Sequence, residues 1–290
     1  MNTFKSYHPA ISFIYFAVTI IFSILTLNPT LIIISFSGAA FYLCMLEGIG
    51  ESFASLGFYI PLLLLITILN PVFSHNGETV LFFLNDRRVT LESILYALAA
   101  GGSLIAVIYW FKSFGEVVTS DKFIYIFGRI IPKLSLLLSM AIRFVPLLKR
   151  KAKEIRAAQK TLGLYSTHSL SDKLSGSMAV FSTLITWALE SSIDTAVSMK
   201  ARGYSLPRRT SFSLFKFDSR DGLFAGIMLI ITVIMSVLFV GGKYAFSYYP
   251  YISYPVQNPL MYIPVAILSF LPFLIEIKEE LKWKYSISKI

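Results

Sequence analysis

The stretch SMKARGYSLPRRT places three arginines, Arg202, Arg208 and Arg209, in a chain that is otherwise strongly apolar. A guanidinium group is a planar fork of donors that can pair bidentately with carboxylates, which makes the contact directional and strong. Arg202 ends a helical pattern just before Gly203, so its charge also suits the carbonyl end of the helix dipole. Ala-Arg-Gly is therefore either a helix stop or a charged tip that docks into an acidic groove on a soluble partner. Arg208 and Arg209 are equally compatible with contacts to lipid headgroups.

Other groups that could carry catalysis or bind a metal lack suitable partners. The single cysteine, Cys44, excludes an intrachain disulfide and a cysteine-based zinc site. The histidines His8, His75 and His168 are scattered, with no pair four residues apart. His75 stands near Glu78, but the Asn-Pro and Asn-Gly pairs around them favour a run of turns. No loop of the type G-x-x-x-x-G-K-[ST] occurs, so we expect neither bound ATP nor a cofactor.

Glu190 and Asp194 lie one helical turn apart and could resemble a catalytic acid and base. No nucleophile or histidine lies near them in the sequence. We interpret them instead as internal ion-pair partners for Arg156 or Lys153 of a neighbouring helix, which would support the helix that carries Arg202.

The composition is that of an integral membrane protein. Of 290 residues 56% are hydrophobic and 14% charged, with a mean hydropathy of +0.69. Six uncharged segments approach the roughly 20 residues needed to cross a bilayer. They are Ile11 to Leu27, Leu31 to Leu46, Phe53 to Leu69, Ser93 to Phe111, Leu223 to Val240 and Leu260 to Ile275. Because they are apolar throughout rather than alternating, we predict an all-α fold of about six transmembrane helices.

The positive charge is concentrated in one internal segment. Residues 112–220 hold 18 lysines and arginines against 7 acidic residues, a net charge of +11. Basic residues near spans mark the cytoplasmic side, which places this segment and both termini inside a prokaryotic cell membrane. The sequence thus predicts N-terminal spans in residues 1–111, a basic cytoplasmic coupling domain in 112–220, and C-terminal spans with a short basic tail in 221–290.

Two helices are expected in the cytoplasmic region. The first, in RFVPLLKRKAKEIRAAQKTLG, has one apolar and one basic face, begins near Pro146 and ends at Gly163. The second extends from about Met178 to Arg202 and ends at Gly203. Its C-terminal half carries a stripe of mostly small residues, which would let another helix approach closely. These residues are Ala188, Ser192, Thr195, Ser198 and Met199.

An ordered set of motifs extends over residues 7 to 221. The motifs are YHPAISFIYF, LNPVFSHNGETVLFFLNDRRVTLESILYAL, IPKLSLLLSMAIRFVPLL, EIRAAQKTLG and WALESSIDTAVSMKARGYSLPRRT. Together they resemble the transmembrane T component of energy-coupling factor (ECF) transporters, the cobalt-transport CbiQ-like family. The resemblance implies two long crossing coupling helices whose Ala-Arg-Gly-type ends insert into grooves on two ABC-type ATPases. It also implies that the membrane part holds a substrate-binding S component for vitamin or metal-ion uptake.

The two helix ends match that pattern to different degrees. Ala201, Arg202 and Gly203 match the second motif fully. At the first motif the sequence has Thr161, Leu162 and Gly163, with leucine where arginine is expected. Any charge there must come from Lys160 or Arg156, so we expect asymmetric contacts dominated by Arg202.

Three other classes of function fit the sequence less well. A self-sufficient secondary transporter usually needs ionisable groups within its spans, and the six segments have none. A membrane-embedded enzyme would need a constellation of nucleophile, base or metal ligands that the chain lacks. Binding of nucleic acid is discounted, because no binding motif occurs and membrane topology explains the positive charge.

Overall fold

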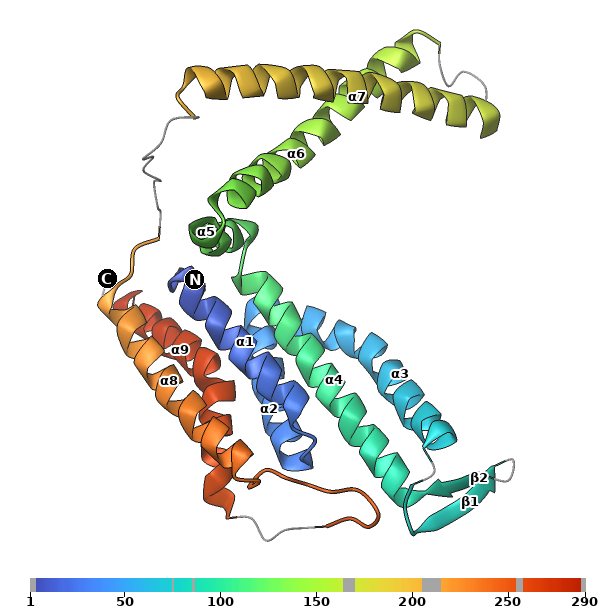
Figure 1. Cartoon of the computed structure of the whole chain (residues 1–290), viewed down its shortest axis with the longest axis vertical. Coiled ribbons are helices and arrows are strands. Elements are labelled where there is room, and N and C mark those ends of the chain that lie inside the picture. Colours follow the sequence, from blue (N-terminus) through green and yellow to red (C-terminus); the bar gives the residue numbers. More distant parts are fainter. Residues whose placement is uncertain are drawn as a thin grey trace. The chain divides into compact units, whose positions relative to one another are not determined.

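The computed structural model describes residues 4–74, 76–84, 87–163, 170–204, 215–253 and 258–287. That part of the chain forms nine α-helices, two short 3-10 helices and one antiparallel hairpin (Figure 1). The predicted all-α class is confirmed. In chain order the elements are η1 (Phe4–Ser6), α1 (Pro9–Leu25), α2 (Pro29–Glu47), α3 (Ile49–Phe73), β1 (Val80–Leu84), β2 (Arg87–Thr90), α4 (Leu91–Val117), α5 (Ser120–Ile130), α6 (Pro132–Thr161), α7 (Leu170–Ala201), α8 (Ser219–Val240), η2 (Pro259–Tyr262) and α9 (Ile263–Ile287).

The chain divides into two compact units. The first combines Met1–Phe123 with Phe215–Ile290 and contains the apolar helices, and the second is Ile124–Leu214. The second unit is therefore an insertion into the sequence of the first.

Five helices among the described residues are long and apolar enough to cross a membrane. They are Pro29–Glu47, Gly50–Phe73, Leu91–Val117, Ser219–Val240 and Pro259–Ser286. The remaining predicted span corresponds to α1, which is apolar but has 17 residues. At 1.5 Å per residue it is about 25 Å long, slightly shorter than a hydrocarbon core of about 30 Å. Each of the six predicted segments thus overlaps an apolar helix of this multi-pass membrane protein, and the first helix is the shortest.

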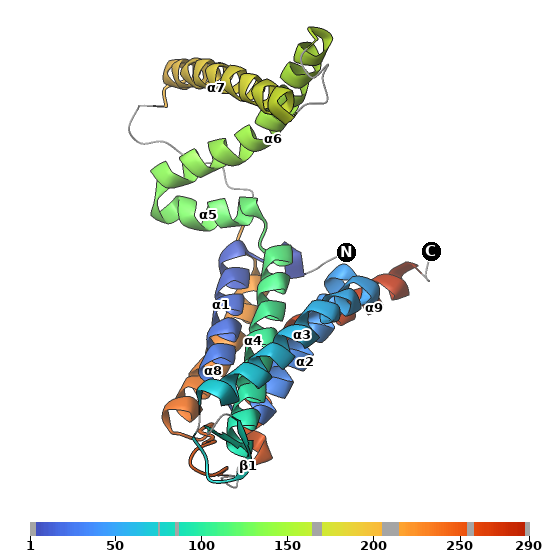
Figure 2. The same ribbon diagram turned by 90° about the vertical axis from the view of Figure 1, so that its right-hand side faces the viewer.

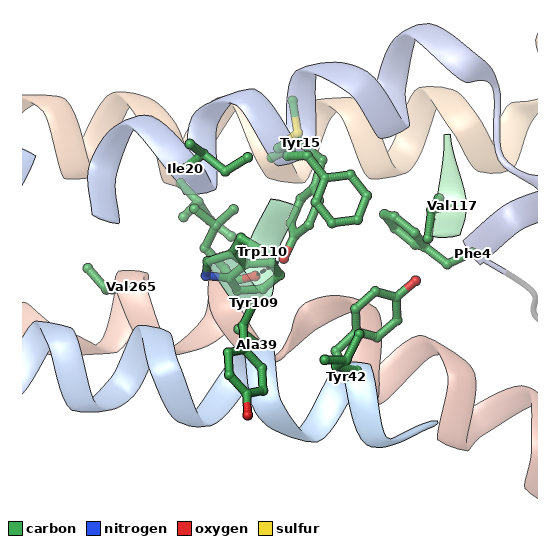
Figure 3. Packing of buried hydrophobic residues seen from close by; sticks show 14 of the residues in the cluster. Phe4, Tyr15, Ile20, Ala39, Tyr42, Tyr109, Trp110, Val117 and Val265 are labelled. Atoms are coloured by element: carbon green, nitrogen blue, oxygen red, sulfur yellow. Dashed lines mark hydrogen bonds between the residues drawn. The ribbon is translucent and has the colours of Figure 1, made fainter. Parts of the chain in front are cut away.

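An aromatic cluster surrounds Phe4 in the first unit (Figure 3), near the starts of α1 and α8 and the end of α2. The Phe4 ring is fully buried, with its centroid 5.4 Å from that of Tyr15 on α1, 6.0 Å from Tyr42 on α2 and 5.7 Å from Phe224 on α8. Its backbone N–H donates to Oε1 of Glu276 on α9 over 3.1 Å. Edge-to-face aromatic pairs stabilise a core beyond the area that they bury. The short turn η1 therefore joins four helices.

A line of polar contacts links α1, α2 and α4 inside the same bundle. The Ser103 hydroxyl donates to the Ser23 carbonyl over 2.7 Å, and the hydroxyls of Ser23 and Ser35 lie 2.7 Å apart. The Trp110 indole N–H donates to the Ser35 hydroxyl over 3.0 Å. Because unpaired polar groups are costly in hydrocarbon, these bonds fix which helix faces meet.

The hairpin β1–β2 was not predicted. The turns were expected for residues 70–79, which precede it, but α3 continues through Asn70 and Pro71 to Phe73. VLFFL pairs antiparallel with RRVT, and its β-branched and aromatic side chains favour a strand. The preceding turn is held to α4 because Glu92 Oε1 accepts the Thr79 backbone N–H over 3.2 Å. The Thr90 hydroxyl donates to the Asn76 carbonyl over 2.8 Å. These contacts fix the hairpin at the start of α4.

The start of α5 is tied to the end of α4 by a buried lysine. Lys122 Nζ donates to the Val117 carbonyl over 3.0 Å, where a cation suits the carbonyl end of a helix. Burial lowers the pKa of Lys122 from its ordinary value, and the nearby charge of Lys5 lowers it further. The contact caps α4 at the cost of desolvating the ammonium group.

The start of α8 depends on a capping box. The Asp218 side chain accepts the Ser219 N–H over 2.8 Å, and the Asp221 carboxylate accepts the Asp218 N–H over 3.0 Å. We expect Asp218→Ala to lower the free energy of unfolding by about 1 kcal/mol, because two N-terminal amides lose an acceptor. Thermal unfolding in detergent measures this. Asp218→Asn is the control and should unfold like the natural chain, since asparagine caps equally well; an equal loss in both variants would contradict a capping role.

Candidate functional site

The second unit is built around the crossing of α6 and α7 (Figure 1, Figure 2). Where they meet, Met140 and Phe144 of α6 and Thr195 and Met199 of α7 line a pocket of about 440 Å³. Further along α6, the Lys151 ammonium lies 5.7 Å from the ring centre of Trp187 on α7. This cation–π contact and the apolar contacts fix where the two helices cross. Three members of the predicted small-residue stripe, Ser192, Thr195 and Met199, line this pocket, so the stripe faces α6 across it.

The C-terminus of α7 has the geometry of a Schellman motif. The Gly203 N–H donates to the Lys200 carbonyl over 3.0 Å, and the Tyr204 N–H donates to the Met199 carbonyl over 3.0 Å. Gly203 has a φ of +75°, a left-handed conformation that glycine adopts without steric cost. Arg202 immediately precedes it and is exposed, as is Ala201. Within the described residues no carboxylate lies within ion-pair distance of Arg202.

The C-terminus of α6 has a similar cap but different chemistry. Gly163 has a φ of +87°, and its N–H donates to the Lys160 carbonyl over 3.2 Å. Lys160 and Thr161 are exposed, and Leu162, at the position that corresponds to Arg202, is 80% exposed. The Thr161 hydroxyl donates to the Ala158 carbonyl over 2.7 Å. Both predicted helix ends are therefore confirmed, and one presents a cation where the other presents an alkyl group.

A long apolar stripe is exposed on α7, and the sequence analysis did not identify it. Its members recur at helical spacing, and each is at least 43% exposed. They are Leu174, Met178, Phe181, Ile185, Leu189, Ile193 and Val197. The stripe is not covered by other described residues, so it is a candidate surface for a membrane or protein contact.

Comparison with known proteins connects this pair of glycine-capped helices to a family. The family model of CbiQ, described as cobalt transport protein, matches residues 5–212. The chain belongs to the CbiQ family. The matched region includes both helix ends, so the resemblance drawn from the motifs is confirmed.

Curated relatives of this family member include three proteins named energy-coupling factor transporter transmembrane protein EcfT. The protein of Lactococcus lactis subsp. cremoris is 25% identical over 185 residues, which are 60% of this chain and 70% of the relative. That of Listeria innocua is 28% identical over 193 residues, 61% and 70% of the two chains. That of Staphylococcus aureus is 25% identical over 191 residues, 62% and 71%. The similarity to EcfT is thus distant but covers most of each chain.

The predicted starts of both helices, α6 and α7, of this CbiQ-family chain are wrong. We expected α6 to begin near Pro146, whereas it begins at Pro132 and continues through Pro146. Pro132 occupies the first turn, where a missing N–H costs nothing. Pro146 lies inside the helix and removes a single backbone bond. Helix α7 likewise begins at Leu170, before the expected Met178.

The predicted ion pairs between the two helices do not occur among the described residues. Glu190 and Asp194 are exposed and pair with neither Arg156 nor Lys153. The crossing places Trp187 against Lys151, whose ion-pair partner is Glu154, 3.0 Å away on its own helix. Spacing within one helix could not reveal this, because the register between helices decides which charges meet.

Four residues discussed from the sequence lie outside the described part of the chain. They are His75, His168, Arg208 and Arg209. Among the residues that the structure describes, no group of three or more histidine, cysteine, aspartate or glutamate side chains could hold a metal ion.

We predict that Gly203→Ala loosens the end of α7. A non-glycine residue in the left-handed region costs about 1 kcal/mol, which corresponds to roughly fivefold faster amide exchange at the capping bonds. Hydrogen exchange of the Tyr204 N–H measures this. Gly115→Ala on α4, where an added Cβ meets nothing within 4 Å, is the control and should leave that exchange unchanged. Unchanged exchange in Gly203→Ala would show that the cap does not hold the tip.

Proposed function

We propose that this chain is the transmembrane coupling subunit of an ATP-driven ECF-type importer of a vitamin or metal ion. Two ABC-type ATPases bind the ends of α6 and α7, and the membrane part holds one substrate-binding S component. The observation that carries the proposal is the exposed guanidinium of Arg202 on a glycine-capped helix end. The chain is non-catalytic, and hydrolysis of ATP belongs to its partners.

The coupling helices are long and firmly capped. Helix α7 has 32 residues and is about 48 Å long at 1.5 Å per residue. When ATP-driven closure moves the ATPase grooves, a helix of this kind transmits the displacement, because the Schellman motif fixes the position of Arg202. The S component then reorients and releases its cargo inside the cell.

The two ATPase contacts are asymmetric. Arg202 pairs with carboxylates in one groove, whereas Leu162 offers no charge to the other. A groove lined by carboxylates would leave them unpaired against leucine, which is costly once water is excluded. Lys160 supplies at most a peripheral charge at that end.

The apolar stripe on α7 supports contact with the membrane-embedded S component. Its seven side chains are exposed in this chain alone, and a partner that buries them would gain hydrophobic free energy. We therefore assign this stripe, rather than the small-residue stripe that lines the pocket with α6, to the partner.

The orientation follows from charge. Residues 112–220 carry a net charge of +11 and form the cytoplasmic coupling domain between the N-terminal spans in 1–111 and the C-terminal spans in 221–290. Both termini lie in the cytoplasm of a prokaryotic cell. Lipid headgroups are the partners of the basic residues that face the bilayer.

The rival assignment is a self-sufficient secondary transporter, which would use a carboxylate within its spans. Glu276 on α9 is buried, but its Oε1 accepts the Phe4 N–H. That bond gives Glu276 a structural role in the bundle and weakens the rival assignment.

Co-purification tests the proposal. A tagged chain, extracted in mild detergent from its native membrane, should recover two ATPase subunits and one small hydrophobic membrane protein for each copy. Recovery of the chain without ATPase subunits, or cargo transport by the isolated chain in liposomes, would refute the assignment.

A further inference from the structure

An apolar cavity of about 500 Å³ lies in the unit that contains the spans. Its walls come from three helices and one connection: Ile32 and Phe36 of α2, Leu63 of α3, Ala99 of α4, and Phe246 and Tyr248 after α8. Among the residues that the structure describes, none that lines it is charged. It belongs to a different unit from the ends of the coupling helices, which carry the proposed ATPase contacts.

The chemistry of the walls excludes water as the occupant. Of the described lining residues, Tyr248 alone has a polar side chain, and its hydroxyl already donates to the Leu27 carbonyl over 2.7 Å. A buried water needs two to four polar partners, and engineered apolar cavities of about 150 Å³ stay dry and bind benzene. A cavity of 500 Å³ with these walls therefore takes a hydrocarbon ligand.

The cavity opens sideways toward the bilayer. Ile33 on α2 and Leu98 on α4 line its rim, and they are 66% and 40% exposed. Because α2 and α4 are membrane-spanning helices, the medium at this opening is the acyl-chain region of the lipid. An acyl chain can enter from the bilayer without crossing water.

The length of the cavity along α4, and the tyrosines at one of its ends, match a single leaflet of the bilayer. The lining residues Leu95 and Ile105 are ten positions apart on α4, about 15 Å along the axis, which is roughly half of the 30 Å hydrocarbon core. Near the Leu95 end, the Tyr96 ring lies 5.6 Å from Tyr248 and 5.5 Å from Tyr249. Tyrosines concentrate at the level of the lipid headgroups. We propose that the cavity binds one acyl chain of a membrane phospholipid, whose headgroup lies at this tyrosine cluster.

Blocking the opening tests the proposal. Leu98→Trp places a large ring at the rim, at a position where exposure leaves room for it. The matched control is Leu104→Trp on the same helix, because Leu104 is 44% exposed and does not line the cavity. Each full-length variant is extracted with its native lipid, washed in detergent, and examined by native mass spectrometry for retained phospholipid.

The natural chain and Leu104→Trp should each retain one phospholipid, and Leu98→Trp should retain at least fivefold less. Ala99→Phe fills the cavity from inside and should show the same loss if Leu98→Trp fails to fold. Phospholipid added to the delipidated natural chain should raise its midpoint of thermal unfolding. Absence of lipid from the natural chain, equal retention in all variants, or a bound polypeptide in place of lipid would overturn the proposal.

Discussion

Reversal of the charge at Arg202 should separate this chain from its ATPases. Arg202→Glu places a carboxylate against the acidic groove that we propose, so attraction becomes repulsion. Loss of one partner of a desolvated charge pair costs about 2–5 kcal/mol, or roughly 30-fold to several thousand-fold in affinity. The measurement is the amount of ATPase that co-purifies with the tagged chain, together with ATP-dependent uptake of cargo by cells. Both should fall to background.

Two further charge reversals make the result specific. Lys153→Glu changes an exposed lysine of α6 away from both helix ends and should leave co-purification unchanged. Lys160→Glu, beside Leu162, should reduce it only mildly, because that end of the molecule does not depend on charge. If Lys160→Glu separates the complex as severely as Arg202→Glu, the asymmetry is refuted. If Arg202→Glu binds ATPase normally, docking at the end of α7 is wrong.

The second large effect is expected at Gly38, where α2 contacts α9. A Cβ at this position would lie 2.7 Å from both the Cβ and the carbonyl oxygen of Ser269. Since the obstacle includes backbone, the helices must separate. We expect Gly38→Ala to lower the free energy of unfolding by about 2–3 kcal/mol, even though alanine favours a helix by about 1 kcal/mol relative to glycine. Thermal unfolding in detergent should show a midpoint lower by about 5 °C or more.

Gly226→Ala on α8 is the matched control. An added Cβ there meets nothing within 4 Å, so the intrinsic preference of alanine should act alone and the midpoint should stay or rise slightly. The difference between the two variants isolates the close approach of α2 and α9. If Gly38→Ala is as stable as Gly226→Ala, these helices do not pack as described.

The sequence by itself was sufficient to predict the membrane spans, the ends of the two coupling helices and the family, because each depends on residues that are close together in the chain. Uncharged apolar runs predicted the spans, because the length of a hydrophobic segment directly reflects the thickness of the bilayer. Gly163 and Gly203 predicted the two helix ends, because few other residues adopt the left-handed conformation that such caps require. The ordered motifs indicated the CbiQ family. The two helix ends could be told apart because one has Arg202 where the other has Leu162.

Features that depend on contacts between helices were decided by the tertiary structure. Pro146 resembles a helix start locally, yet α6 begins fourteen residues earlier, at Pro132, and continues through it. Glu190 and Asp194 have suitable spacing for ion pairs, but the register of the crossing leaves them exposed.

The burial of Phe4 and the apolar cavity likewise have no local signature in the sequence. A sequence encodes the polarity and backbone preference of each residue, and these fix helices, caps and membrane insertion. Which side chains meet is fixed by how whole helices pack, and that choice exists only once the fold has formed.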